Sequence, residues 1–156
     1  GWGLTDKGES EVRLRRNPEE AQIWMESFTA LVSSKYGCSL YRAFLLREFS
    51  TENLDFWLAV EDYRNSKPQK MAVKAQQIYN EFVAVEASKE VNLDAETRLI
   101  TWANVQSSNP DQHAFDRAQK RIKHMMERDS YLRFLQSKLF LELAHPDQYC
   151  PSAIED

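Results

Sequence analysis

The stretch FSTENLDFWLAVEDY, residues 49–63, joins short or polar side chains to a densely apolar run. At helical spacing that run points in nearly every direction around the axis, and a helix that is apolar on all sides is packed on all sides. We therefore expect a central helix of a bundle here. Its polar first turn must emerge where the bundle meets water, which puts Glu52 and Asn53 at the exposed tip of a rigid element. The apolar residues are Leu54, Phe56, Trp57, Leu58, Ala59 and Val60.

Helix-start signals recur along the chain. In NPEE (17–20) and NPDQ (109–112) an asparagine can cap a helix whose first position is proline. No segment alternates in strand fashion for long, and no Asn-Gly or Asp-Gly hairpin turn occurs. We predict an all-α fold, a compact bundle of seven to nine helices. The candidate caps are Asn17, Ser50 or Thr51, Asp94 and Asn109, and the expected helices are 18–33, 39–48, 51–66, 70–85, 94–106, 110–128 and 130–142.

Within these ranges apolar residues recur at helical spacing, and this recurrence predicts which faces enter the core. Each face is the stripe that one helix would turn toward its neighbours. The predicted faces are Met71, Ala75, Ile78, Phe82 and Val85; Leu99 and Trp102; Phe115, Ala118, Ile122 and Met125; and Tyr131, Phe134 and Leu135.

The totals indicate one globular domain. A chain of 156 residues with 42% hydrophobic and 28% charged residues can bury a real core. We expect a mobile lead-in over residues 1–17, the domain over 18–144 and a loose tail over 145–156. The basic cluster RLRR (13–16) is either a solvated arm or a weak contact with an anionic membrane.

Several function classes are disfavoured. The net charge of −4 argues against nucleic-acid binding. Gly37 is the only glycine beyond the first eight residues, so no glycine-rich phosphate loop exists. No apolar run approaches the roughly 20 residues that span a bilayer, and no secretory signal is evident, so a cytoplasmic protein is expected. Cys38 and Cys150 are interpreted as two free thiols, with a single disulfide as the alternative.

Catalytic chemistry has little support in the sequence. Cys38 has no motif pairing it with His113 or His124, and the three histidines are too scattered for a metal site. We expect no enzymatic activity, no metal, no cofactor and a monomer. One basic group surrounds the apolar stripe of 110–128 and is either a solvated face or a contact with acidic lipid headgroups. Its members are Arg117, Lys120, Arg121, Lys123, His124 and Arg128, of which Lys120, Arg121 and Lys123 are the lipid-facing candidates.

Taken together, several segments resemble the regulator of G-protein signalling (RGS) domain, and the similarity is greatest to small single-domain members. The resemblance covers about residues 18–144 in the family's order and spacing. The segments are YRAFL (41–45), EFSTENLDFWLAVEDY (48–63), KAQQIYNEF (74–82), KEVNLDAETR (89–98), FDRAQKRI (115–122) and MMERDSYLRFLQSKLFLEL (125–143).

This resemblance implies an all-helical domain that accelerates GTP hydrolysis by heterotrimeric G-protein α subunits (Gα), without an active site of its own. In the family, three loops at one end of the bundle grip the switch segments of Gα. Two departures stand out: Val60 stands where relatives often have Cys, and Leu132 replaces Ser, Pro or Arg. By position, the residues that would contact Gα are Ser50, Glu52, Asn53, Asn92, Met125, Asp129, Ser130 and Arg133.

The resemblance also implies a mechanism by restraint. Gα supplies its own catalytic arginine, and its glutamine orients the attacking water, so a helper need only hold the switch segments in their reactive shape. The Asn92 amide both donates and accepts, and is the side chain that we expect to matter most. Asp129 and Arg133 lie four apart and should pair on one helical face. The alternative is a non-catalytic binding domain that sequesters activated Gα or anionic lipid without accelerating hydrolysis.

Overall fold

The computed structural model describes residues 18–148, and every regular element in that part of the chain is helical, as predicted. No helix in this range is long and apolar enough to cross a membrane. The predictions for Asn17, Cys150, the lead-in, the RLRR cluster and the end of the tail lie outside the described residues. After a helical stretch over 18–26 come α2 (Phe28–Ser33), α3 (Lys35–Arg47), α4 (Glu52–Arg64), α5 (Pro68–Ile78), the π-helix η1 (Tyr79–Val83), α6 (Ala95–Gln106), α7 (Asp116–Arg128), α8 (Ser130–Leu135) and α9 (Lys138–Ala144).

The described residues divide into two compact units. Residues 18–47 and 129–148 form one, which we call the terminal unit, and residues 48–128 form the other, the central unit. The terminal unit therefore brings together segments from both ends of the described chain. Each unit has its own buried core.

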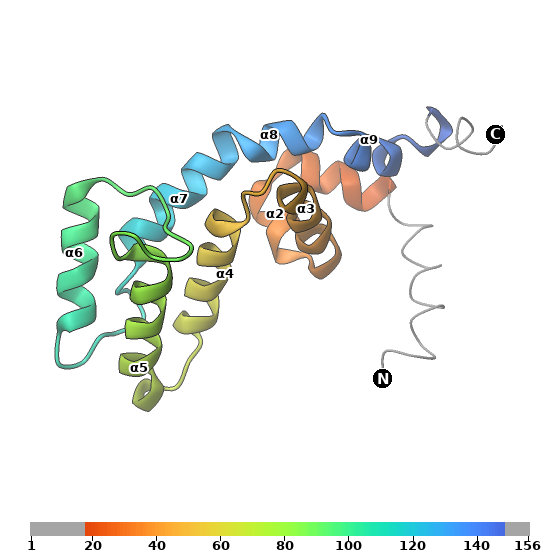
Figure 1. The fold of residues 1–156 in the computed structure, drawn as a ribbon. Coiled ribbons are helices and arrows are strands. Elements are labelled where there is room, and N and C mark those ends of the chain that lie inside the picture. Colours follow the sequence, from red (N-terminus) through yellow and green to blue (C-terminus); the bar gives the residue numbers. More distant parts are fainter. Residues whose placement is uncertain (1–17, 149–156) are drawn as a thin grey trace. The chain divides into compact units, whose positions relative to one another are not determined.

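In the terminal unit, α2 packs on α3, α3 on α8, and α8 on α9 (Figure 1). The Phe28 ring meets that of Tyr41 edge-on at 5.9 Å and that of Tyr131 at 5.3 Å. Phe134 lies against Tyr41 and Phe140. Edge-to-face contacts add to the stabilisation from apolar burial, so this aromatic cluster connects α2 and α3 to the late helices α8 and α9.

Gly37 is required by this packing. A Cβ atom at that position would lie 2.7 Å from the Leu31 carbonyl oxygen and 2.8 Å from Cε2 of Trp24. Both distances are shorter than van der Waals contact, and one of the two atoms is backbone. Only glycine therefore lets the start of α3 approach the preceding helical segments this closely.

In the central unit, α4 contacts α5 and α7, while α6 also contacts α5 and α7 (Figure 1). The α4 residues Leu54, Phe56, Val60 and Tyr63 are buried, as expected for a central helix. Trp57, however, is only half-buried, so the prediction that α4 is packed on all sides is wrong at this residue.

A polar network also connects α4 to α7. The Arg64 guanidinium lies 2.8 Å from Glu61 and 2.7 Å from Asp116, and it donates to Gln119. The Gln119 amide in turn donates to Glu61 at 2.7 Å and to the Trp57 carbonyl oxygen at 3.2 Å. Gln119 is buried yet well satisfied, which is the condition under which a buried amide does not destabilise a core.

Helix α7 begins at Asp116, not at the expected residue 110. The Asp111 carboxylate accepts a hydrogen bond from the His113 amide at 2.8 Å and closes a local turn that competes with the helix. Its carbonyl oxygen accepts a bond from the Tyr63 hydroxyl at 2.6 Å. Burial of Tyr63, together with the Asp111 charge, raises the pKa of its phenol. The predicted cap at Asn109 was therefore wrong.

Two predicted core faces also needed correction. Val85 is 71% exposed because the π-turn shifts the phase of the helix and the helix ends before it. Leu99 and Trp102 face outward, whereas Thr97 and Thr101 are buried on α6. The Thr101 hydroxyl donates to the Thr97 carbonyl oxygen at 2.8 Å, so this polar side chain can enter the core with its hydrogen bond made.

Candidate functional site

The start of α4 presents the first group of predicted contact residues. Ser50, Glu52 and Asn53 are all partly exposed. Thr51 stands at the N-cap position, as predicted, but its side chain makes no capping hydrogen bond. Its carbonyl oxygen accepts the Asp55 amide at 2.9 Å, so the helix begins on backbone bonding alone. The polar side chains of this turn are thus presented on a rigid helix end.

Phe49 is a candidate that sequence reasoning missed. Its side chain is 95% exposed, and its backbone has φ of 55°, a region that bulky residues rarely adopt. The combination of an exposed aromatic side chain and left-handed backbone makes Phe49 a candidate contact residue. The sequence offered one signal: the turn that leads into the central helix contains no glycine, so another residue must adopt any left-handed conformation there.

The loop between η1 and α6 carries Asn92. Its two neighbours are anchored, because Val91 is 1% exposed and Leu93 is 7% exposed. In extended backbone successive side chains point to opposite sides. Burial of both flanking residues therefore turns the Asn92 side chain outward, and Asn92 is exposed.

Backbone bonds fix this loop to the preceding helix. The Ala84 amide donates to the Tyr79 carbonyl oxygen at 2.8 Å, the wide spacing of a π-turn. The next carbonyls, which a helix end leaves unpaired, accept from the loop. Glu81 accepts the Lys89 amide at 3.1 Å, and Phe82 accepts the Val91 amide at 2.9 Å. The geometry of the Asn92 loop is thus set before any partner binds.

Side chains connect the same loop to α4 and α7. The Lys89 ammonium lies 3.6 Å from the Asp55 carboxylate in the first turn of α4. The Arg121 Nε atom of α7 donates to the Asn92 carbonyl oxygen at 3.4 Å. The exposed tip of α4, the Asn92 loop and α7 are therefore linked within the central unit.

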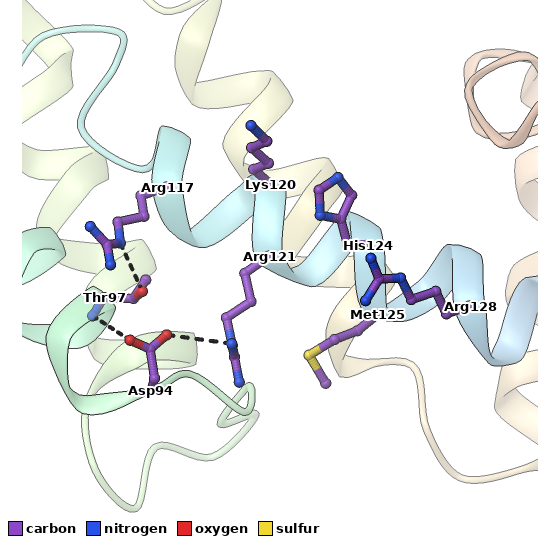
Figure 2. A pocket seen from close by; sticks show the side chains of 8 residues that line it. All are labelled: Asp94, Thr97, Arg117, Lys120, Arg121, His124, Met125 and Arg128. Atoms are coloured by element: carbon purple, nitrogen blue, oxygen red, sulfur yellow. Dashed lines mark hydrogen bonds and ion pairs between the residues drawn. The ribbon is translucent and has the colours of Figure 1, made fainter.

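Asp94 caps α6, as predicted. Its carboxylate accepts the Thr97 amide at 3.1 Å and lies 3.5 Å from the Arg121 guanidinium (Figure 2). The hydrogen bonding from Thr97 holds the pKa of Asp94 below its ordinary value, and the Arg121 charge lowers it further. The residue that follows the Asn92 loop is therefore ionised throughout the neutral range.

Met125 lies one turn beyond Arg121 on α7 and is half-buried. Its neighbour Met126, at 1% exposure, continues the core stripe that had been predicted to include Met125. The Met125 side chain instead lines a surface groove of about 610 Å³ (Figure 2). That position makes it an accessible apolar contact near the Asn92 loop.

The same groove receives part of the basic group of α7. Of the lipid-facing candidates, Lys120 is exposed and lines the groove, and Arg121 lines it while paired with Asp94. Lys123 is half-buried and is not among the lining residues. The accessible cationic surface therefore differs from the predicted set. The groove is lined by Asp94, Thr97, Arg117, Lys120, Arg121, His124, Met125 and Arg128.

The remaining predicted contacts lie at the start of α8, in the terminal unit. Asp129 and Arg133 form the predicted ion pair, and both are exposed. Ser130 is only 8% exposed, and its hydroxyl oxygen lies 2.5 Å from that of Tyr41. Ser130 therefore offers little direct surface and instead connects the first turn of α8 to α3.

The sequence comparisons identify the family. The sequence model of the Regulator of G protein signaling domain matches residues 27–143, which span both units. The chain belongs to this family. The curated relatives include regulator of G-protein signaling 8 from Mus musculus, at 46% identity over 93% of this chain and 79% of that protein. The Homo sapiens protein of the same name is 45% identical over the same shares.

A solved structure supports the RGS fold. The PDZRhoGEF rgRGS domain, determined in a complex with Galpha-13 bound to GTP-gamma-S, aligns with a TM-score of 0.67. The alignment covers 80% of this chain and 64% of that one, at 19% identity. Membership in the RGS family makes this chain a GTPase activator for Gα rather than an enzyme.

Proposed function

We propose that the α4 tip, the Asn92 loop, Met125 and the start of α8 contact the switch segments of GTP-bound or transition-state Gα. Acceleration then comes from restraint, because Gα already holds the catalytic arginine and glutamine. A roughly hundredfold acceleration requires about 2.7 kcal/mol of additional transition-state stabilisation. A few hydrogen bonds, each contributing about 0.5–1.5 kcal/mol net, are sufficient.

The observation that carries this proposal is the outward presentation of Asn92 between buried Val91 and Leu93. An amide on pre-ordered backbone can donate and accept at once without altering the charge of the site. It therefore restrains a partner side chain at little entropic cost. The proposed role of Asn92 is to steady the catalytic glutamine and the adjoining switch segment of Gα.

The other residues have distinct proposed roles. Glu52 and Asn53 supply hydrogen bonds from the helix tip, and Met125 supplies apolar contact. Asp129, oriented by its pair with Arg133, accepts a switch backbone amide. Ser50 contributes beside the α4 tip, and buried Ser130 acts through the position of α8.

The remaining features of the proposal concern where and how the protein acts. We propose that residues 18–144 form the Gα-binding domain, that it works as a monomer in the cytoplasm, and that it meets Gα at the inner face of the plasma membrane. A weak anionic membrane contact through the two exposed members of the predicted set, Lys120 and Arg121, is part of this proposal. It is tested by sedimentation with acidic vesicles.

The decisive experiment is single-turnover GTP hydrolysis by purified Gα with and without saturating protein. We expect acceleration, together with tighter binding to Gα loaded with GDP and aluminium fluoride than to Gα with GDP alone. An unchanged rate despite tight binding would leave the sequestering alternative. Equal binding to both nucleotide states would exclude transition-state complementarity.

A further inference from the structure

The groove on α7 contains cations of two kinds. Arg117 and Arg121 are engaged: Arg117 donates to the Thr97 hydroxyl at 3.0 Å and pairs with Glu96, and Arg121 pairs with Asp94. Figure 2 shows both arginines reaching toward the start of α6. These pairs fix one wall of the groove, and the Asp94 carboxylate in that wall is already paired with Arg121.

The second kind has no such partner. Within residues 18–148, the side chains of Lys120, His124 and Arg128 form no hydrogen bond or ion pair, and all three are exposed. They are four residues apart, so they follow one side of α7 at steps of about 6 Å. In a chain of net charge −4, Lys120 and Arg128 are two unpaired positive charges on one side of α7, with the His124 imidazole between them.

We propose that this groove binds a compact, multiply phosphorylated ligand along Lys120, His124 and Arg128. The groove is an open surface depression of about 610 Å³, which has room for a small molecule or for one phosphorylated headgroup. Two cations with an imidazole between them, at regular steps of about 6 Å, match several phosphate groups carried on one ring. Asp94 does not repel such an anion strongly, because Thr97 and Arg121 already engage its carboxylate.

The primary test measures binding of inositol hexakisphosphate to the whole chain by isothermal titration calorimetry. We expect saturable binding that weakens as salt is raised. The variant Lys120→Gln/Arg128→Gln should bind at least tenfold more weakly. The matched control Lys35→Gln/Arg47→Gln removes two exposed charges from α3 and should bind normally. Absence of binding of the unmodified chain both to this probe and to vesicles that carry phosphatidylinositol 4,5-bisphosphate, or an equal loss in the control, would overturn the proposal.

Two additional arms identify the source of the phosphates. Vesicles containing phosphatidylinositol 4,5-bisphosphate should bind the protein more strongly than phosphatidylserine vesicles of equal charge. Binding to the bisphosphate vesicles without binding of the soluble probe would assign the site to a lipid headgroup. Equal binding to both vesicle types, or to poly-glutamate as well as to the phosphates, would show a diffuse charge effect and contradict a built site.

A ligand bound in this groove would affect the activation of Gα, an effect that rests on the proposed function. Met125 lines the same groove, so a bound ligand would restrict its contact with Gα. Inositol hexakisphosphate should then reduce the acceleration of GTP hydrolysis, and the Lys120→Gln/Arg128→Gln variant should resist this effect. Direct calorimetric binding without inhibition would preserve the site and contradict the role assigned to Met125.

Discussion

The hydroxyl oxygens of Tyr41 and Ser130 lie 2.5 Å apart although 89 residues separate them in the sequence. Both side chains are buried, so neither can exchange this bond for water without cost. The contact fixes the first turn of α8 onto α3. The exposed pair of Asp129 and Arg133 at that turn is positioned accordingly.

Loss of this bond should destabilise the fold moderately. Tyr41→Phe and Ser130→Ala are each expected to lower the free energy of unfolding by about 0.5–1.5 kcal/mol, because each removes this hydrogen bond. Urea denaturation measures the change. The double variant should lose less than the sum of the two single variants. Fully additive losses would contradict a direct coupling.

Asn92→Ala should reduce the acceleration of GTP hydrolysis at least tenfold, which corresponds to about 1.4 kcal/mol of transition-state stabilisation. The melting temperature should change little, because Arg121 bonds to the backbone oxygen of residue 92, which alanine retains. Asn109→Ala is the matched control, an exposed loop asparagine in a pocket beside Pro68. Full activity in Asn92→Ala would mean that the loop has been assigned the wrong role.

Phe49→Gly should separate binding from folding. Glycine removes about 1 kcal/mol of strain from the left-handed backbone of the folded state. Its greater conformational freedom stabilises the unfolded chain by a similar free energy, so the melting temperature should stay nearly constant. Loss of the exposed ring should weaken Gα binding by roughly tenfold. Surface plasmon resonance measures this. Val73→Ala, which truncates an exposed apolar residue of α5, should leave affinity unchanged; an equal loss there would indicate a non-specific effect.

Acid should weaken the cap of α6. The folded-state pKa of Asp94 is depressed, so its contribution to stability is complete above the unfolded value of about 3.9 and is lost as the pH falls through the folded value. Asp94→Asn retains a good cap residue but cannot titrate. Thermal melts between pH 2 and 7 should therefore show a shallower acid decline in this variant. Identical declines would rule out Asp94 as a source of acid sensitivity.

Phe56→Ala should lower the free energy of unfolding by about 3–5 kcal/mol, because it opens a cavity at a side chain that is 0% exposed. Trp57→Ala should have a smaller effect despite the larger side chain, since Trp57 is half-buried. Chemical denaturation of both variants gives the comparison. A greater loss at Trp57 would mean that the burial of α4 has been misjudged.

The sequence predicted the helical class and the cap at Asp94 because these depend on local patterns. Asp94 capping Thr97 is one such case, since the capping residue and its partner lie within one turn. Helix ends were less predictable where a turn competed with the helix. The start of α7 moved because Asp111 closes a turn on His113, and Tyr63 from α4 reinforces it.

The candidate site was predictable in part for the same reason. The pairing of Asp129 with Arg133 followed from their spacing along one helix. The burial of Ser130 depends on Tyr41, which is far away in sequence and has no local signal. The exposed, left-handed Phe49 likewise depends on tertiary packing, because sequence alone does not distinguish a buried aromatic from one held in water.

The bonds from Lys89 and Val91 to the carbonyls of Glu81 and Phe82 make the Asn92 loop continuous with the helix before it. Most of the backbone bonding that defines its shape is contained within residues 79–94. The backbone shape of this segment is therefore set locally, whereas the outward direction of Asn92 also depends on the burial of Val91 and Leu93. Residues inserted between Phe82 and Lys89 would lengthen the loop but leave the bonds from Lys89 to Glu81 and from Val91 to Phe82 in register. A residue inserted between Lys89 and Val91 would shift the second bond out of register.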